Sequence, residues 1–388
     1  MNVVQFIGAY DRSITDPEAL LDHHWTVVGW AEAVAATGEA RVTVLQRFDR
    51  PARLSRNGVE YVFFRDGSRR HRRWRPSVTL CRHLIHTRPD VLHVRGFRAP
   101  LEAWAARQIL RASTAIVMQD HGGVDLASGR LGSTLSPSRL VRRRAMRAVD
   151  GFLFTAAAQA EPWRRAGLVS LEQKVYEVQT ASTVMKPLPR AGARERSGIG
   201  GDPAVLWVGR LNANKDPLAV LEGFERSLSS LPEATLTMIY GEDDLLTAVR
   251  GRIESSPALA RRVRLVGRVA HEEIAAYFSA ADLFVLGSHR EVCGYALIEA
   301  CACGAVPVVT DIPPFRRVTD GGAFGALWAP GDPSALARAL VDAGRQTLHL
   351  VRSRMAAHFE RALSWPAVGR RAVDIYRDSL SHRRAACR

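Results

Sequence analysis

Two glutamates eight residues apart, Glu291 and Glu299, lie in the segment REVCGYALIEACACGAVPVVTD. The preceding run AADLFVLGSH is typical of a buried strand that ends in a loop, and the residues from Cys293 onward are typical of a helix. This order places Glu291 at the tip of the loop and Glu299 about two turns into the helix. Carboxylates accept hydrogen bonds from sugar and ribose hydroxyls, and the N–H groups of a helix N-terminus attract phosphate. The pattern therefore indicates a nucleotide-sugar site.

Two cations follow another predicted strand. In LWVGRLNANKDP, Gly209 and Arg210 come directly after the apolar run, and Lys215 lies five residues beyond Arg210. Two positive charges at the end of a rigid strand suit a diphosphate, on which negative charge grows as a sugar–phosphate bond breaks. Either cation alone would usually be a solvated surface charge. The pair, next to the loop with the glutamates, favours the diphosphate interpretation.

Three further candidates come at strand ends. RVRLVGRVAHEE places Gly267 and Arg268 after a strand, where a glycine lets the backbone approach a flat base. A plain turn glycine is the alternative, and on these residues alone it is favoured. TAIVMQDHGG sets His121 at a strand end in the first half, where it would bond a transferred sugar, although an isolated histidine is more often structural. His93, in DVLHVRG, is a second such histidine.

Other groups invite different chemistry. The acidic run 242–244 would suit Mg²⁺ or Mn²⁺, but EDDLL is also typical of a helix start with acids in its first turn, which we favour. Cys293, near a helix N-terminus, would have a lowered pKa, yet a small tolerated loop residue is the simpler interpretation. Cys301 and Cys303 are typical of buried helix positions. Residues 23–25, His-His-Trp, would either line an acceptor pocket or anchor the helix that follows.

Length and composition limit the class of protein. A chain of 388 residues favours two domains, and 47% hydrophobic residues is ordinary for a soluble protein. No apolar run reaches the about 18 residues that span a bilayer, and the start MNVVQFIGAYDR predicts a core strand and no signal peptide. Five cysteines without zinc spacing indicate reduced thiols in a cytosolic protein. Neither GxGxxG after a strand nor GxxxxGK[ST] occurs, which excludes these two phosphate-binding motifs.

The net charge of +15 is concentrated in the first half. Residues 1–190 hold 29 of the 54 Lys and Arg residues but 17 of the 39 Asp and Glu residues, and the excess lies in Arg65–Arg75 and Arg139–Arg147. Such clusters indicate an anionic partner such as a membrane surface, a lipid-linked phosphate or nucleic acid. A generally arginine-rich proteome is an equal alternative. Nucleic acid is disfavoured because the clusters lack regularly interleaved aromatic residues.

Apolar runs alternate with helical patterns along both halves, which predicts parallel sheets covered by helices on both faces. The strands expected in the first half are NVVQFIG, ARVTVLQRF, VEYVFF, DVLHVRG, TAIVMQDHG, GFLFTAA and KVYEVQT. A Pro- and Gly-rich stretch, 186–203, is typical of a linker. The pattern then restarts with AVLWVGR, ATLTMIYG, RVRLVGRV, LFVLGSH, AVPVVTD and GALWAP. We therefore expect domains at 1–190 and 200–360 and a terminal helix in 361–388, with ligands at the carboxyl ends of the strands.

The second half resembles the donor-binding half of family 4 retaining glycosyltransferases of the GT-B fold. The segments that carry the resemblance are VGRLNANKDPLAVLEGF, VRLVGRVAHEEIAAYFSAADLFVLGSHREVCGYALIEACACGAVPVVTD with its Glu-x7-Glu element, and PGDPSALARAL. FERALSWPAVGRRAVDIY resembles the family's C-terminal segment, which crosses back onto the first domain. The resemblance is strong over residues 200–380 and otherwise one of layout. It implies an α/β fold of two Rossmann-like, doubly wound domains that face a central cleft.

The resemblance also implies roles for residues of the second half. Arg210 and Lys215 would neutralise the donor diphosphate. Glu291 would bond sugar hydroxyls near the anomeric carbon, Glu299 would hold the ribose hydroxyls, and Arg268 would lie at the base.

Further contacts follow from the same resemblance. The backbone at Cys293, Gly294 and Tyr295 would touch sugar and phosphate, Gly209 would lie at the donor beside Arg210, and His121 would contact the transferred sugar. The family retains the anomeric configuration, without a cofactor and usually without a metal. The departing phosphate itself helps to deprotonate the acceptor on the same face.

The chain departs from this family in two places. Gly8–Asp11 replaces a Gly-Gly pair in the first loop, and VQTASTV replaces a Pro-Asn-Gly segment. The leading hypothesis is a cytoplasmic glycosyltransferase, peripheral at the inner membrane face, that uses a UDP- or GDP-type donor. Its acceptor stays open among lipids, polysaccharide intermediates and small molecules. The alternatives are a catalytically silent nucleotide-sugar-binding or interaction protein and a GT-B phosphorylase or epimerase.

Overall fold

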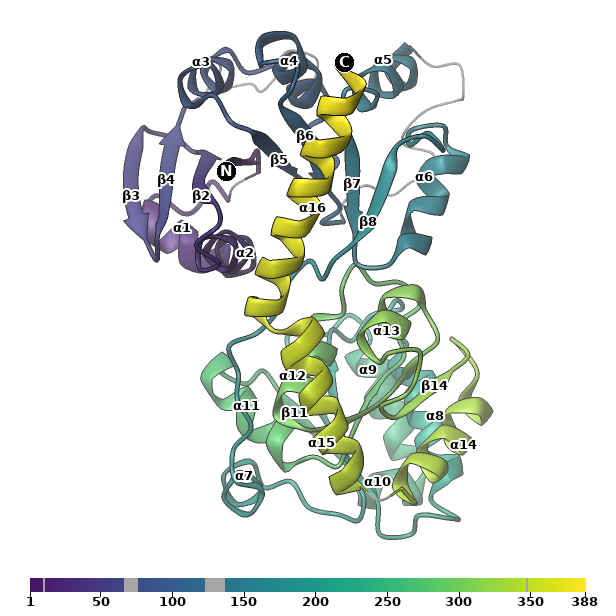
Figure 1. Cartoon of the computed structure of the whole chain (residues 1–388). Coiled ribbons are helices and arrows are strands. Elements are labelled where there is room, and N and C mark those ends of the chain that lie inside the picture. The colour runs from purple at the N-terminus through teal and green to yellow at the C-terminus, as the bar shows by residue number, and fades with distance from the viewer. Residues whose placement is uncertain (10, 66–75, 123–136, 347) are drawn as a thin grey trace. The chain divides into compact units, whose positions relative to one another are not determined.

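The computed structural model describes the chain except for residues 10, 66–75, 123–136 and 347. The chain divides into two compact units. Unit 1 contains Met1–Ala181 and Trp365–Arg388, and unit 2 contains Ser182–Ser364. Each unit is a sheet with helices packed against it (Figure 1).

Unit 1 has a sheet of eight strands in the described residues, in the order β3-β4-β2-β1-β5-β6-β7-β8. The strands are β1 (Asn2–Ile7), β2 (Arg41–Arg47), β3 (Ala52–Arg56), β4 (Val59–Phe64), β5 (Val91–Arg95), β6 (Ala115–Gln119), β7 (Gly151–Phe154) and β8 (Lys174–Glu177). The seven expected strands of the first half are confirmed, and they pair in parallel. The edge strand β3 was not expected. It pairs antiparallel with β4 through a tight turn at Asn57 and Gly58, both with positive φ.

Alternation along the strands of unit 1 divides its core between the two faces of the sheet. Val3 and Ile7 of β1 belong to one apolar cluster, while Val4 and Phe6 belong to the other. The first face is covered by α1 (Pro17–His23), α2 (Trp25–Ala35) and α16 (Trp365–Ala386). The second is covered by α3 (Val78–Thr87), α4 (Pro100–Ile109), α5 (Pro137–Met146) and α6 (Glu161–Arg165), the last preceded by the short 3₁₀ turn η1 (Ala157–Ala160).

The C-terminal helix α16 crosses the first face of this sheet and packs along α2 (Figure 1). Glycines allow the two helices to approach closely. A Cβ at Gly369 would lie 2.2 Å from the carbonyl oxygen of Ala33, and one at Gly29 would lie 2.4 Å from the ring of Trp365. The terminal helix is therefore part of the core of unit 1, as the sequence predicts for a segment that returns to the first domain.

Unit 2 has a parallel sheet of six strands in the order β11-β10-β9-β12-β13-β14, and all six were expected. They are β9 (Ala204–Gly209), β10 (Thr235–Tyr240), β11 (Val263–Gly267), β12 (Leu283–Leu286), β13 (Val306–Thr310) and β14 (Ala326–Trp328). The helices are α7 (Arg190–Ser197), α8 (Pro217–Ser227), α9 (Leu246–Glu254), α10 (Pro257–Arg262), α11 (His271–Ala280), α12 (Tyr295–Cys303), α13 (Pro313–Val318), α14 (Pro333–Gly344) and α15 (Leu348–His358), followed by a π-turn, η2 (Phe359–Leu363).

The prediction of a linker at 186–203 is wrong. Residues 190–197 of this stretch form helix α7, and both Ala193 in the helix and Ile199 just after it are buried in the core of unit 2. Asp282, which precedes β12, holds the helix in place. Its carboxylate pairs with Arg190, with Arg194 at 3.0 Å and with Arg352 of α15 at 3.1 Å, and it accepts the N–H of Ala204 at 2.9 Å. The chain instead passes from unit 1 to unit 2 between residues 181 and 182.

The packing of α16 on α2 can be tested by Gly369→Ala. The added methyl group collides with the backbone of α2, so we expect a loss of about 1–3 kcal/mol of unfolding free energy and a lower thermal midpoint. Gly192→Ala in α7 is the control, because nothing lies within 4 Å of its Cβ position. Equal midpoints for both variants would show that the close approach is absent.

Candidate functional site

The site of unit 2 lies where the strand order of its sheet reverses. From β9 the chain proceeds outward to β10 and β11, then returns to place β12 on the other side of β9. In open α/β sheets, ligands bind at such a switch point, outside the carboxyl ends of the two central strands. The loops that follow β9 and β12 contain the two residues of the expected site that carry most of its chemistry, Lys215 and Glu291.

These two loops are joined to each other by hydrogen bonds. The His289 N–H donates to the carbonyl oxygen of Asn214 at 2.8 Å, and the Asn214 amide donates to the carbonyl oxygen of Arg290 at 3.0 Å. A third contact links the His289 ring to the Asp216 carboxylate at 3.0 Å. Gly287 permits the approach, since a Cβ there would lie 3.0 Å from the carbonyl oxygen of Lys215.

Lys215 and Glu291 form an ion pair between the joined loops. Their side chains are only 17% and 15% exposed, so the pair is shielded from most solvent screening. The Ser288 hydroxyl also donates to the same carboxylate oxygen of Glu291, at 2.8 Å. The sequence predicts both residues at one site, and the structure places them in direct contact.

Helix α12 begins beside this pair. Its N-cap is Gly294, with φ 73°, and a Cβ at this position would lie 2.5 Å from the ring of Phe315. Only glycine fits both the backbone conformation and the space. Burial raises the pKa of Cys293 to about 12, and the neighbouring Glu291 adds to the effect. Cys293 is therefore a protonated thiol at neutral pH, which agrees with a structural role and excludes an activated nucleophile.

Glu299 lies in α12 and is buried, with 6% of its surface exposed. Burial raises the pKa of its carboxyl group to about 7. Tyr295, one turn earlier, donates its hydroxyl to the carbonyl oxygen of Ser182 at 3.3 Å, and burial raises its pKa. A hydrogen bond from a ligand hydroxyl stabilises the charged form of a buried carboxyl group whose pKa lies near 7, and this favours binding of the ligand.

The other expected donor contacts lie along the same edge of the sheet. Arg210 follows β9 and pairs with Glu242, which follows β10, at 3.6 Å; its side chain is 64% exposed. Arg268 follows β11 and donates to the carbonyl oxygen of Gly241 at 3.1 Å. Gly209 ends β9 against the ring of Trp207. The structure thus brings Lys215 to Glu291 but turns Arg210 toward Glu242.

The acidic run 242–244 was expected to form the first turn of a helix, and the structure places it elsewhere. Residues 242–244 precede helix α9, which begins at Leu246, and so do not form its first turn. In the described residues, no three His, Cys, Asp or Glu side chains are grouped as metal ligands.

In unit 1, His121 lies two residues after Gln119 of β6, which is in register with Arg95 of β5, and the positive charge of Arg95 lowers the pKa of both His121 and His93. Burial is the larger cause and keeps both histidines neutral. His24 joins α1 to α2, and burial lowers its pKa too. These placements do not test the contact of His121 with the transferred sugar, which stays a prediction.

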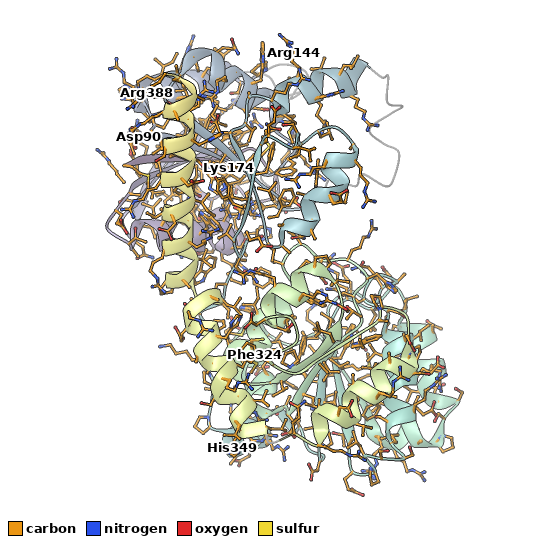
Figure 2. All side chains as sticks on the ribbon, turned by 45° about the vertical axis from the view of Figure 1, so that its right-hand side comes forward. Asp90, Arg144, Lys174, Phe324, His349 and Arg388 are labelled. Atoms are coloured by element: carbon orange, nitrogen blue, oxygen red, sulfur yellow. The ribbon has the colours of Figure 1, made fainter. Side chains whose placement is uncertain are left out.

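One of the two basic clusters can be placed in the structure, and it lies on the second face of unit 1. Residues 66–75 of the first cluster lie outside the described residues. The second cluster lies on α5 and just after it: Arg143 and Arg144 of α5 are exposed beside Leu140 and Val141, and Arg147 is exposed one residue beyond the end of the helix. Arg144 is labelled in Figure 2. No helix in the described ranges has the length and apolarity that crossing a membrane requires.

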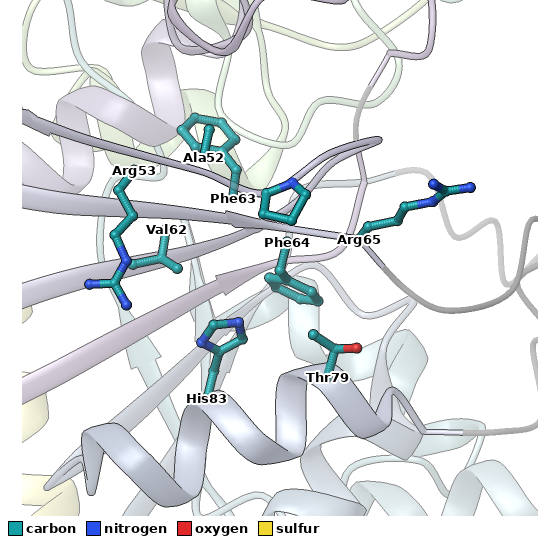
Figure 3. A pocket seen from close by; sticks show the side chains of 9 residues that line it. Ala52, Arg53, Val62, Phe63, Phe64, Arg65, Thr79 and His83 are labelled. Carbon is teal, nitrogen blue, oxygen red and sulfur yellow. The ribbon is translucent and has the colours of Figure 1, made fainter.

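A pocket of about 310 Å³ lies at the outer edge of the sheet of unit 1 (Figure 3). Phe64 and His83 line it, their rings 5.4 Å apart, together with Arg53 and Arg65. Three strands separate β4 from β6, so this pocket is distinct from the position of His121.

Several residues of the site were missed by sequence reasoning. Asn214, Asp216 and His289 join the two loops, and Ser288 holds the Glu291 carboxylate within its own loop. The available signal was Asp216 before Pro217, which is typical of a helix N-cap, and Asp216 does accept the Ala219 N–H at 3.2 Å.

The fold is the GT-B type, with two parallel-sheet, Rossmann-like domains. A solved structure of Anabaena Alr3699/HepE in complex with UDP superposes with a TM-score of 0.69, at 16% identity, over 97% of this chain and all of that one. Residues 190–352 match the model of the family Glycosyl transferases group 1. This match lies within unit 2.

Two curated relatives match about half of the chain. A D-inositol 3-phosphate glycosyltransferase from Thermobispora bispora is 29% identical over 51% of this chain and 48% of its own. A mannosylfructose-phosphate synthase from Agrobacterium fabrum is 32% identical over 47% of this chain and 42% of its own. The chain thus spans about half the length of these relatives.

The raised pKa of Glu299 makes stability depend on pH. The folded chain releases this proton near pH 7, whereas the ordinary value is 4.5, so the unfolding free energy falls as the pH rises between them. Glu299→Gln removes the titration. We expect it to match the wild type near pH 5 and to be more stable above pH 7, by up to about 3 kcal/mol.

The measurement is the thermal midpoint of both proteins between pH 5 and 8. Glu272→Gln, at an exposed position in the first turn of α11, is the control and should follow the wild type. Parallel curves for Glu299→Gln and the wild type would contradict the assignment.

Proposed function

We propose that this chain is a retaining glycosyltransferase that moves a sugar from a UDP- or GDP-type donor to an acceptor. The observation that carries the proposal is the shielded contact of Lys215 with Glu291 at the switch point of unit 2. A cation and a carboxylate held together at this place match the two halves of a nucleotide sugar, its diphosphate and its hydroxylated ring.

When the donor binds, it can replace each residue of the ion pair as the partner of the other. The diphosphate takes the place of Glu291 as the partner of Lys215, and a sugar hydroxyl takes the place of Lys215 as the partner of Glu291. Lys215 then faces the oxygen on which negative charge develops as the glycosidic bond to phosphate breaks. Arg210, exposed and only loosely paired with Glu242, can turn toward the same phosphate.

The remaining donor contacts follow the strand ends. Glu299 accepts the ribose hydroxyls, Arg268 lies at the base, and the backbone at Cys293–Tyr295 meets sugar and phosphate at the start of α12. In this scheme the leaving phosphate takes the acceptor proton, so the side chains named here supply the charge stabilisation and no metal ion is required. We expect activity to survive EDTA.

The relatives support a transferase, because their names describe glycosyl transfer and sugar-phosphate synthesis. The matched structure binds UDP, which favours a nucleotide donor here. A silent binding protein of the same fold would keep donor affinity and show no transfer, and a phosphorylase or epimerase would act on the donor without an acceptor.

Variants of the ion pair test the proposal. Glu291→Gln removes the competing carboxylate from Lys215, so we expect UDP or GDP to bind several-fold more tightly while transfer slows. Lys215→Met should weaken binding about tenfold, the usual magnitude of a charge-assisted hydrogen bond. Calorimetry with UDP, GDP and ADP measures both.

The control is Glu222→Gln, which breaks an exposed ion pair with Arg226 on α8. Unchanged nucleotide affinity in both site variants, or nucleotide affinity that changes equally in the control, would place the donor elsewhere.

We further propose that α5 attaches unit 1 peripherally to the anionic inner surface of the cytoplasmic membrane. Exposed Leu140 and Val141 beside exposed arginines combine apolar insertion with charge attraction. The double change Arg143→Glu and Arg144→Glu should abolish binding to vesicles that contain phosphatidylserine or phosphatidylglycerol.

Arg250→Glu with Arg261→Glu is the control, since it changes the net charge equally at exposed positions of α9 and α10 in unit 2. If the α5 variant sedimented with anionic vesicles as well as the control does, the attachment surface would not be α5.

A further inference from the structure

Arg95 at the end of β5 is a buried cation without a partner. Only 7% of its surface is exposed, and its Nε, Nη1 and Nη2 atoms form no hydrogen bond within the described chain. Its guanidinium lies 4.9 Å from the ring centre of Trp30. Burial lowers the pKa of Arg95 to about 9, and only Tyr376 acts against this effect. A buried charge that nothing balances is costly, so such a group normally faces a counter-ion.

The sheet face around Arg95 changes from apolar to polar along the strands. Val3 and Val91 occupy its apolar end, in the core with α2 and α16. Toward the carboxyl ends, Gln5 is in register with His93, and Arg95 is in register with Gln119. Since partners in a parallel pair share a face, these side chains lie on one surface. The two glutamines are fully buried, and the Gln5 amide has no hydrogen-bond partner in the described residues.

The unpaired atoms are mostly donors. Trp30 Nε1–H donates to the Tyr376 hydroxyl at 3.2 Å, so that hydroxyl can donate to His93 Nδ1 at 2.8 Å. The proton of the neutral His93 ring is then on Nε2, which is buried without a partner in the described chain. Arg95 contributes five further N–H groups. A donor-rich, positively charged surface needs an acceptor-rich, negatively charged ligand.

His121 adjoins this surface. Arg95 lowers the pKa of His121 and of His93, so the three basic side chains lie near one another, and His121 Nε2 is also buried and unpaired in the described chain. Unit 1 pairs its other buried arginines: Arg47 contacts Glu102 at 3.2 Å, and Arg107 contacts Asp150 at 2.5 Å. Unlike these two arginines, Arg95 has no carboxylate partner among the described residues.

We propose that Arg95, with His93, Gln119 and His121 beside it, binds an oxyanion, a phosphate or carboxylate group, carried by the acceptor. The assignment of the ligand as the acceptor rests on the proposed function, because the proposed contacts to the donor nucleotide are in unit 2. The oxyanion site itself does not depend on it.

The test measures oxyanion binding directly, on the full chain. Inorganic phosphate, acetate, a hexose 6-phosphate and the free hexose are titrated by calorimetry and by thermal shift, against the wild type and Arg95→Met. We expect phosphate or acetate to bind the wild type and to raise its thermal midpoint, because a ligand of the folded state stabilises it. Arg95→Met should bind at least about tenfold more weakly.

Arg95→Met also removes an unpaired buried charge, so without ligand it should be at least as stable as the wild type. Arg95→Lys should retain part of the affinity. Arg354→Met is the control, because Arg354 also lies over an aromatic ring, that of Phe324, but is exposed. Tighter binding of phosphate than acetate assigns a phosphate-bearing acceptor, and the reverse assigns a carboxylate.

Nucleoside diphosphate binding is measured in parallel. Arg95→Met should retain nucleotide binding. If neither the wild type nor any variant bound a nucleoside diphosphate, the proposed donor site would be contradicted, while the oxyanion result would still stand. The proposal is overturned if no oxyanion binds the wild type, or if Arg95→Met binds phosphate and acetate as the wild type does. Either result would mean that internal water alone satisfies Arg95.

Discussion

The lateral contact between the loops after β9 and β12 is the constraint on which the site of unit 2 depends. The strands are neighbours in the sheet but are far apart in sequence, so nothing local holds their loops in register. The backbone bond from His289 to Asn214 sets that register, and the Lys215–Glu291 pair completes it. Gly287 is required for both, because a side chain there would push the loops apart. Recognition and local architecture therefore use the same few atoms.

The two units treat buried charge differently. Unit 2 balances it: Asp282 has three arginine partners, and Lys215 has Glu291. Burying these charged groups costs desolvation free energy, and the attraction between the opposite charges offsets that cost. Unit 1 does the same for Arg47 and Arg107 but leaves Arg95 unbalanced on its polar strand ends. Charge left unbalanced in a core is a less stable arrangement, and the oxyanion proposed for Arg95 would supply the missing counter-charge.

The strands could be predicted because parallel strands buried on both faces are continuous apolar runs, as in LWVG before Arg210. Their carboxyl ends placed the candidate residues at one edge of each sheet. The antiparallel β3 was missed although Asn57-Gly58 is a hairpin signal, because its own residues are mostly polar and exposed. The stretch 186–203 was taken for a linker because the glycines and prolines around α7 outweighed the few residues that are buried.

Side-chain direction was beyond the sequence. Arg210 and Lys215 follow the same strand, yet one turns to Glu242 and the other to Glu291, which depends on contacts between distant segments. Arg95 likewise looks in sequence like a strand-end surface residue. Its burial follows from helices α2 and α16, and the second of these is about 270 residues away along the chain.

The return of α16 to unit 1 has a consequence for biosynthesis. The ribosome synthesises residues 1–181 long before Trp365–Arg388. Until α16 has been made, Trp30 and His93 on the sheet of unit 1 lack the helix that covers them. Unit 2 is contiguous, and its whole sequence is available first. The usual N-to-C order of domain folding is thereby reversed, because the first unit to emerge is the last that can be completed.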